Sequence, residues 1–275
     1  MFNAIKNSIK RKIARKVTKV YPVKIDHFNT TSYGIIDFAN WSNPLTSDVV
    51  IRDIYIDFFK QFLKEGDLTI DIGANIGHMT VAMGLVCGKS GLTLAFDPNP
   101  FVFNVLSENI KLNPEKTNIK AFNVAITTEE DEYYYNSSEA SFNNGGISKE
   151  PNGNHGKYAL SQKIKGINLE KFLKENFATQ MANLKLIKID TEGYDKEVIK
   201  SISTLITTYY PVVISECFGK TTPEERFEHF ELLNSKGYNL FHINDLISTT
   251  EIIPINTKED MLKWHHFDFY AVKSV

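Results

Sequence analysis

The chain alternates between short apolar runs and longer stretches in which apolar residues recur every three to four positions. The apolar runs have the length of buried strands, and the longer stretches have the periodicity of amphipathic helices. Such alternation predicts an α/β fold in which parallel strands form one sheet and helices cover both of its faces. The predicted strands lie near residues 68–73, 92–97, 119–127, 184–190, 212–216, 238–243 and 267–272.

Local signals place several helix ends and one long loop. The segment 222–225 (Thr-Pro-Glu-Glu) has the residues of a capping box, with proline at the first helical position, and predicts a helix start. Ser47 is predicted to cap another helix that runs to about Lys64. The segment 137–156 is polar and rich in asparagine and glycine. A loop of this length in a compact domain is usually a functional lid or disordered.

Residues 1–20 carry seven basic side chains and no acidic one. Their apolar residues recur at helical spacing and are Phe2, Ile5, Ile9, Ile13 and Val17. A basic amphipathic helix can lie on an anionic membrane. The alternative, which we favour, is a helix packed on its own domain or on a partner subunit, since one apolar stripe fits both. We expect residues 1–46 to form this helix and short strands, ahead of a main domain at 47–275.

The composition fits one compact domain with additions rather than two equal domains. The chain has 275 residues, of which 42% are hydrophobic, and a formal net charge of −2, which gives no case for nucleic-acid binding. Cys87 and Cys217 match no metal-site spacing and indicate buried thiols in a reducing compartment. Without an apolar run of membrane-spanning length or a leader pattern, we expect a cytoplasmic protein, with peripheral membrane contact through residues 1–20 as the open alternative.

The segment 71–78 (Asp-Ile-Gly-Ala-Asn-Ile-Gly-His) links the first main-domain strand to a helix. Gly73 and Gly77 would let the backbone approach a ligand closely, and amides at the helix start favour an anionic group. A dinucleotide fingerprint has three glycines and cradles a pyrophosphate, which Asp71 would repel. A ligand with both an ammonium and a carboxylate, such as S-adenosylmethionine, suits this turn better.

Asp97 ends the second of these strands, where an acidic residue is suited to a ribose diol. Dinucleotide enzymes share this feature, so only Asp71 and Asn75 discriminate between the two cofactor classes. An NAD-type oxidoreductase is therefore the alternative that these residues oppose.

The chain resembles the FkbM-type S-adenosylmethionine-dependent methyltransferases over roughly residues 50–217. The resemblance rests on the segments 71–77, 95–100 (Ala-Phe-Asp-Pro-Asn-Pro), 144–146 (Asn-Gly-Gly), 188–194 (Lys-Ile-Asp-Thr-Glu-Gly-Tyr) and 211–216 (Pro-Val-Val-Ile-Ser-Glu). It implies the class I fold, a Rossmann-like, doubly wound, seven-stranded sheet that is mostly parallel with an antiparallel last strand. The family more often has Glu at the position of Asp97, and Asp can still hold a diol.

The motif and the resemblance together assign a cofactor site and an acceptor site. The cofactor residues are Asp71, Gly73, Ala74, Asn75, Gly77, His78, Asp97, Asn99 and Ala125. The acceptor residues, all in the segment 137–156, are Ser141, Asn144, Gly146 and His155. Taken alone, His155 fits a solvated loop histidine better, and His78 could equally cover the turn.

Asp190 and Glu192 are the candidate catalytic residues. Alternation along the strand places Lys188 and Asp190 on one face, beside the cofactor crevice. Methyl transfer to an alcohol requires loss of the hydroxyl proton, and a nearby carboxylate can act as the general base. The alternatives are Mg²⁺ held by the clustered carboxylates, which we do not favour, and a structural role for Glu192. His265 and His266 are adjacent, share no face, and are expected on the surface rather than in a metal site.

We therefore expect an S-adenosylmethionine-dependent O-methyltransferase that acts on a hydroxyl of a glycan or of a small natural product. Many N-methyltransferases carry prolines directly after the acidic residue at this strand end, and their absence after Asp190 favours oxygen as the acceptor. Two alternatives stay open: the NAD-type oxidoreductase, and a non-catalytic cofactor-binding subunit that anchors a biosynthetic complex at the membrane.

Overall fold

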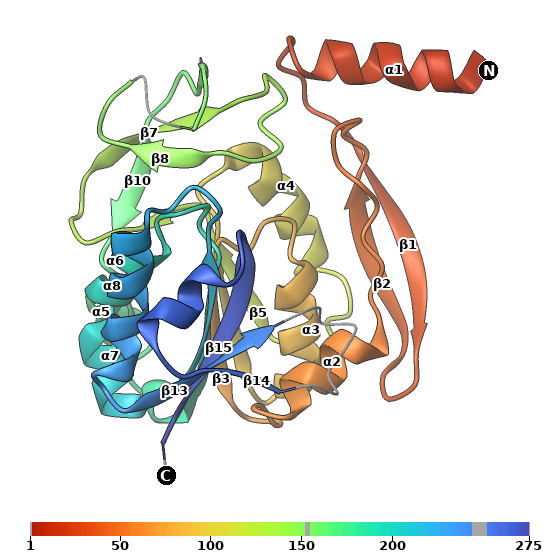
Figure 1. Ribbon diagram of the computed structural model, residues 1–275. Helices are drawn as coiled ribbons and strands as arrows, with labels where there is room; N and C mark the ends of the chain where they lie inside the picture. The colour runs from red at the N-terminus through yellow and green to blue at the C-terminus, as the bar shows by residue number, and fades with distance from the viewer. Residues whose placement is uncertain (1, 152–154, 244–251, 275) are drawn as a thin grey trace.

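The computed structural model describes residues 2–151, 155–243 and 252–274. Its central sheet has eight strands, in the spatial order β14 (Ile253–Ile255), β13 (Tyr238–Ile243), β15 (Phe267–Lys273), β12 (Val212–Cys217), β11 (Leu184–Ile189), β3 (Leu68–Ile72), β4 (Leu92–Phe96) and β5 (Ile119–Phe122) (Figure 1). The strands from β12 to β5 are parallel, whereas β15 runs antiparallel to both β12 and β13. This arrangement confirms the predicted doubly wound fold and adds the short edge strand β14.

Helices cover both faces of the sheet and bury two hydrophobic cores. One face carries α2 (Asp53–Lys60), α3 (His78–Cys87) and α4 (Pro100–Asn109). The other carries α5 (Leu169–Asn176), α6 (Asp195–Ser201), α7 (Ser203–Tyr209) and α8 (Pro223–Asn234). The short 3-10 helices η1 (Met181–Asn183) and η2 (Lys258–Leu262) add Met181 and Met261 to the same core. Leu186 and Ile187 are neighbours on β11 but pack into different cores, as expected for a strand buried on both faces.

The helix-end signals in the sequence were only partly informative. The capping box before α8 is confirmed, since Thr222 Oγ1 accepts from Glu225 N at 3.3 Å and Glu225 Oε2 accepts from Thr222 N at 2.8 Å. The helix predicted from Ser47 is wrong at its start, because α2 begins at Asp53. The side chain of Asn40 binds both the N–H and the C=O of Val49, at 2.7 and 2.9 Å, and holds this stretch against the neighbouring strand instead.

A second, smaller sheet lies at the carboxyl end of the main sheet (Figure 1). Its strands are, in order, β6 (Ala125–Ile126), β10 (Ile164–Ile167), β7 (Glu132–Ser137) and β8 (Gly146–Ser148), and β9 (Tyr158–Ala159) also pairs with β7. The single strand predicted at 119–127 is therefore divided between the two sheets. The segment predicted as a loop at 137–156 contains β8, because its backbone pairs with β7 from Tyr134 to Asn136.

The N-terminal segment consists of α1 (Phe2–Ala14) and a hairpin of β1 (Val23–Thr30) and β2 (Gly34–Trp41), which lies beside α4 (Figure 1). Asn109 Oδ1 accepts from Ala39 N at 2.6 Å, and Asn109 Nδ2 donates to Ala39 O at 3.0 Å. Asn113 binds the backbone of Asp37 in the same way. The two asparagines mimic a pairing strand and attach the hairpin to the main domain.

Helix α1 does not bury its apolar stripe. Ile5, Ile9 and Ile13 are 55%, 53% and 49% exposed. The expectation that the stripe packs on its own domain is therefore wrong, whereas packing on a partner subunit stays a prediction. Within the described residues, no helix combines the length and the apolar character that crossing a bilayer requires.

Candidate active site

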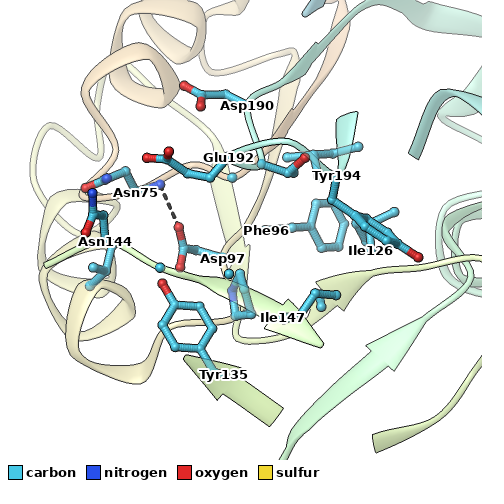
Figure 2. Close-up of a pocket in the computed structure, with 18 of the residues that line it drawn as sticks. Asn75, Phe96, Asp97, Ile126, Tyr135, Asn144, Ile147, Asp190, Glu192 and Tyr194 are labelled. Atoms are coloured by element: carbon cyan, nitrogen blue, oxygen red, sulfur yellow. Dashed lines mark hydrogen bonds between the residues drawn. The ribbon is translucent and has the colours of Figure 1, made fainter. Parts of the chain in front are cut away.

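A cavity of about 240 Å³ lies at the carboxyl ends of β3, β4 and β11 and is roofed by residues 143–147 (Figure 2). We call it the cofactor cavity. The predicted site residues on its wall are Gly73, Asn75, Asp97, Ala125, Asn144, Gly146, Asp190 and Glu192. Segments far apart in the sequence thus meet in the crevice where doubly wound sheets bind their ligands.

Asp97 directly follows β4, and its carboxylate lies on the wall of the cofactor cavity (Figure 2). Its Oδ2 accepts from Asn75 N at 2.8 Å, and its Oδ1 accepts from Asn99 N at 2.9 Å. Burial raises the pKa of this carboxyl to about 7, although the two amides act in the opposite direction. The side chain is fixed by the backbone and keeps lone pairs that can accept hydrogen bonds from a diol.

The turn after β3 needs glycine mainly because other parts of the chain approach it closely. At Gly73, with φ +76°, a Cβ would lie 1.7 Å from the carbonyl oxygen of Asp190. At Gly77, with φ +94°, a Cβ would lie 2.8 Å from Leu106 Cδ1 on α4. We expected these positions to need glycine so that a ligand could approach the backbone, but packing within the chain is the stronger requirement. Gly73 also lines the cofactor cavity.

Asp71 is fully buried on β3 and lies outside the wall of the cofactor cavity. Its Oδ2 accepts from Thr80 Oγ1 at 2.6 Å, and Lys188 Nζ lies 3.5 Å from its Oδ1. Burial lowers the pKa of Lys188, but the carboxylates of Asp190 and Asp71 outweigh burial and raise it. Lys188 is therefore a buried cation, and it already pairs with the acid that was expected to face the cofactor ammonium.

Asp190 is the residue at which three cavities meet. It lines the cofactor cavity, a second cavity of about 320 Å³ beside Asp71 and Lys188, and a third of about 620 Å³. We call the third one the acceptor cavity; its wall includes Tyr55, Glu216, His242, Trp264, His266 and Asp268. Asp190 Oδ2 lies 3.1 Å from Lys188 Nζ, which confirms that residues 188 and 190 share one face. Asp190 can thus contact a ligand in the cofactor cavity and another in the acceptor cavity.

The turn after β11 contains backbone strain. Glu192 has φ +57° and is followed by Gly193 with φ +103°. A left-handed conformation costs a non-glycine residue about 1–3 kcal/mol and persists only where its surroundings impose it. Asp195 does so here, since its Oδ2 accepts from Thr191 Oγ1 at 2.9 Å and from the N–H groups of Thr191 and Gly193 at 3.3 Å. Glu192 consequently lies on the cavity wall, near Asn75 in Figure 2.

Two predicted site residues have structural roles instead and do not line the cofactor cavity. Asn99 caps α4, since its Oδ1 accepts from Phe101 N at 3.0 Å, while its Nδ2 donates to Phe142 O at 2.6 Å. Ser141 is fully buried, and its hydroxyl lies 3.2 Å from Asn143 Oδ1. Both residues shape the segment that roofs the cavity rather than its interior.

Ala74 and the predicted histidines also lie off the cofactor cavity. Ala74 and His78 line the second cavity. The His78 ring packs edge-on against Tyr55 with centroids 4.7 Å apart, and burial lowers its pKa to about 4. His155 is partly buried. Its ring packs against the roof, since a Cβ at Gly146 would lie 2.5 Å from it. We therefore assign His155 to support of the roof, not to a solvated loop.

Several functional residues were missed in the sequence. Tyr135 and Tyr194 line the cofactor cavity, and Tyr135 directs its hydroxyl toward Asp97 (Figure 2). Sequence carries no signal for Tyr135, because it reaches the cavity through pairing within the small sheet. The sequence did carry a signal for Glu216, because this residue ends a predicted strand as Asp190 does. His266, expected on the open surface, has its Nε2 at 2.6 Å from Glu216 Oε1.

Acidic side chains dominate the electrostatics of these cavities. Burial raises the pKa of Glu216 to about 9 and that of Asp195 to about 7, and Asp190 contributes in both cases. In the part of the chain that the structure describes, no group of three or more His, Cys, Asp or Glu side chains is placed to hold a metal ion. Because burial and mutual repulsion favour the protonated form of these carboxyls, a cationic ligand stabilises their ionised form, and the sulfonium and ammonium of S-adenosylmethionine fit this role.

A comparison with known protein families shows to which family the protein with these cavities belongs. A family model described as the methyltransferase FkbM domain matches residues 71–240, more than half of the chain. The chain belongs to the FkbM methyltransferase family. It is therefore an S-adenosylmethionine-dependent methyltransferase, and every residue on the wall of the cofactor cavity lies within the matched region.

Solved structures to which this FkbM methyltransferase is similar include an FkbM methyltransferase from Methylobacillus flagellatus KT, with 11% identity over 78% of this chain and 50% of that chain and a TM-score of 0.43. Another is an S-adenosylmethionine-dependent O-methyltransferase from Thermotoga maritima, with 14% identity, coverage of 92% and 78%, and a TM-score of 0.42. A third is precorrin-6y C5,15-methyltransferase from Geobacter metallireducens GS-15, with 14% identity, coverage of 86% and 95%, and a TM-score of 0.44. These likenesses concern the fold alone. No curated protein matches the chain.

Proposed function

We propose that this FkbM methyltransferase methylates a hydroxyl of a glycan or of a small natural product. The observation that carries the proposal is the position of Asp190, which lines both the cofactor cavity and the acceptor cavity. When bound, S-adenosylmethionine supplies an electrophilic methyl group carried on a sulfonium. A hydroxyl in the acceptor cavity can approach this group beside Asp190.

The wall of the cofactor cavity offers a partner for each part of the cofactor. Asp97 is placed to accept the ribose hydroxyls. Phe96, Ala125 and Ile126 form apolar wall on which an adenine ring can pack. Asp190, at the opposite end, provides negative charge for the sulfonium and ammonium. We assign no direct contact to Asp71, because Lys188 pairs with it.

Asp190 is oriented for its role by Lys188. The ion pair at 3.1 Å fixes one carboxylate oxygen, Oδ2. The other oxygen can accept a hydrogen bond from an acceptor hydroxyl and so direct a lone pair of that hydroxyl toward the methyl group. Positioning of this kind supplies a large part of the rate in methyl transfer.

The acceptor cavity supports a hydroxyl-rich acceptor. His242 and Trp264 stack on its wall with ring centroids 3.9 Å apart and planes inclined by 16°. Glu216 and Asp268 place carboxyl groups on the same wall. Sugars combine donor hydroxyls with apolar C–H faces, and aromatic rings beside hydrogen-bond acceptors complement both. An NAD-type reaction is opposed by the acid at Asp190, where a pyrophosphate would be repelled.

Transfer from methyl-labelled S-adenosylmethionine to an acceptor panel tests this proposal. The panel contains mono- and oligosaccharides, hydroxylated small natural products, and amines of matched size. We expect label in hydroxyl acceptors only. Label in amines alone would overturn the choice of oxygen, and cofactor binding without any transfer would favour the non-catalytic alternative.

Substitution of Asp190 tests the role of this residue. Asp190→Asn should lower turnover by about 10²-fold and weaken cofactor binding to a smaller extent, because an amide of nearly the same shape lacks the negative charge that faces the sulfonium and orients the acceptor hydroxyl. Asp57→Asn is the matched control, since Asp57 is an exposed carboxylate that pairs with Lys60 on α2. Normal turnover of Asp190→Asn would remove Asp190 from the mechanism.

A further inference from the structure

Glu216 and His266 form a connected pair on the wall of the acceptor cavity. Glu216 lies on β12, and His266 directly precedes β15, the neighbouring strand. His266 Nε2 lies 2.6 Å from Glu216 Oε1. The His266 ring also packs edge-on against Phe218, with centroids 5.6 Å apart. Two contacts therefore hold the orientation of an imidazole that is still 47% exposed.

We infer that His266 accepts the proton of the acceptor hydroxyl and that Glu216 is its positioning residue. The inference rests on the proposed function, because it assigns the base of that reaction. Asp190 shares the acceptor cavity with this pair but is already engaged with Lys188. The imidazole of His266 uses one ring nitrogen, Nε2, for Glu216, which leaves the other for the proton of an acceptor hydroxyl.

The proposed step is balanced without any further reactant. The acceptor oxygen forms a bond to the methyl carbon, and the carbon–sulfur bond breaks with its electron pair left on sulfur. In molecules in which Glu216 is ionised and accepts a hydrogen bond from Nε2–H, the proton of the hydroxyl passes to the ring nitrogen Nδ1 of His266. The imidazolium then releases its proton to solvent, which the exposure of the ring permits.

Charged groups from three segments surround His266. Glu216 lies on β12, Asp268 on β15 and Glu192 in the turn after β11, and the charges of Glu192 and Asp268 interact with that of His266. Lys220, in the turn after β12, acts on Glu192 and offsets part of this negative charge. A mainly acidic surrounding stabilises the imidazolium that forms when the proton is taken.

The test compares His266→Gln with His265→Gln, a matched control on the adjacent and exposed histidine. With a hydroxyl acceptor that the wild type methylates, His266→Gln should lose about 10²–10⁴-fold in kcat with unchanged cofactor affinity. Its pH–rate profile should lose the acidic limb that a titrating base produces. Glu216→Gln should keep this limb but displace it, which loss of packing alone would not do.

The outcomes separate the inference from the function. A wild type that methylates no hydroxyl overturns the proposed function. A wild type that methylates hydroxyls while His266→Gln matches it in rate and pH profile overturns the inference and leaves the function standing.

Helix α1 supports a second, independent proposal. Its residues Ile5, Ile9 and Ile13, together with Val17 beyond its end, form an exposed apolar stripe. The seven basic side chains near the stripe are Lys6, Lys10, Arg11, Lys12, Arg15, Lys16 and Lys19, and among the described residues none of them takes part in a salt bridge. The helix end is tied to the segment that leads into the roof of the cofactor cavity, because Ala14 is buried and Ala140 N donates to Arg15 O at 3.2 Å.

We propose that this stripe lies on an anionic lipid surface. The choice of occupant rests on charge, since a basic stripe complements anionic headgroups, whereas a second copy of this chain would bring seven like charges against it. The tether at Ala140 places such a surface next to the roof of the cofactor cavity. An acceptor carried by the membrane would then be presented near the site.

Flotation with vesicles tests the membrane proposal on the full chain. Wild type should float with phosphatidylcholine vesicles that contain 30% phosphatidylserine and not with phosphatidylcholine alone, and binding should fall as salt rises. Ile9→Glu/Ile13→Glu should bind at least about tenfold more weakly. Ile35→Glu is the matched control, because Ile35 is 61% exposed on the hairpin. Lys10→Glu should weaken binding by at least about fivefold.

Three results would overturn this proposal: equal flotation with neutral vesicles, wild-type flotation of the Ile9→Glu/Ile13→Glu variant, or self-association that the same variant abolishes. The last result would identify a second copy as the occupant of the stripe.

Discussion

The ends of β3 and β4 look alike in sequence and differ in the structure. Each parallel strand runs into an acidic residue, Asp71 or Asp97, and each acid is buried. Asp71 is engaged by side chains, with Thr80 at 2.6 Å and Lys188 at 3.5 Å. Asp97 is engaged by two backbone amides and stays on the wall of the cofactor cavity.

The difference shows how one sequence signal can lead to two roles. A buried carboxylate that faces a buried cation is part of the scaffold, because removing either partner leaves the other charge uncompensated. A buried carboxylate held by amides has no cation beside it, so it can attract the hydroxyls of a ligand. The carboxylate of Asp71 at the end of β3 therefore supports the structure of the site, and the carboxylate of Asp97 after β4 binds the ligand.

The largest effect on stability should follow from a substitution in the turn after β3, the strand end that is part of the scaffold. Gly73→Ala would place a methyl group 1.7 Å from a backbone oxygen, and β11 would have to move away from β3. We expect a loss of unfolding free energy of about 5 kcal/mol or more, measured by chemical denaturation. Gly34→Ala is the control, with φ +67° and no atom within 4 Å of its Cβ, and should cost only about 1–2 kcal/mol of backbone strain. Equal losses for both variants would refute the close approach of β11.

A somewhat smaller effect should follow from breaking the Asp71–Lys188 pair. Asp71→Ala leaves Lys188 less compensated in the interior and should lower the unfolding free energy by about 3–5 kcal/mol. The double variant Asp71→Ala/Lys188→Met should recover part of this loss. If Asp71→Ala instead kept its stability and lost cofactor affinity, Asp71 would be a ligand contact, and the contrast between the strand ends would disappear.

A still smaller effect is expected when cofactor affinity is measured as a function of pH. Burial raises the pKa of the Asp97 carboxyl to about 7, so at pH 6 most molecules carry the protonated form. The ionised form accepts ribose hydroxyls best, and cofactor affinity should therefore rise by about tenfold from pH 6 to pH 8. Asp97→Asn should flatten this dependence. The raised pKa also means that the folded state holds this proton more tightly than the unfolded state, so the carboxyl favours folding at pH 4 and this contribution is lost as pH rises through 7.

Sequence predicted the fold and part of the wall of the cofactor cavity, for a physical reason. The strands 68–73, 92–97, 184–190 and 212–216 are local apolar runs, and the residues that end parallel strands meet at one edge by geometry. Asp97 and Asp190 could therefore be placed together in advance.

The rest of both cavities was predicted poorly because it depends on contacts between distant segments. Tyr135 reaches the cavity only through strand pairing in the small sheet, and His266 faces Glu216 only because β15 returns beside β12. Asn99 looked like a ligand contact because it follows Asp97, but its amide is used to cap α4 and hold the roof. Side-chain partners of this kind leave no periodic trace in the sequence.

The most direct test of the account is calorimetric titration of the wild type and of Asp97→Ala with S-adenosylmethionine and with NADH. The wild type should bind one S-adenosylmethionine per chain and give no heat with NADH. Asp97→Ala should bind S-adenosylmethionine more weakly by about 1.5–3 kcal/mol, the value of hydrogen bonds to a charged group. Tight binding of NADH without a response to S-adenosylmethionine, or equal affinity of the two proteins, would contradict the assignment of this cavity.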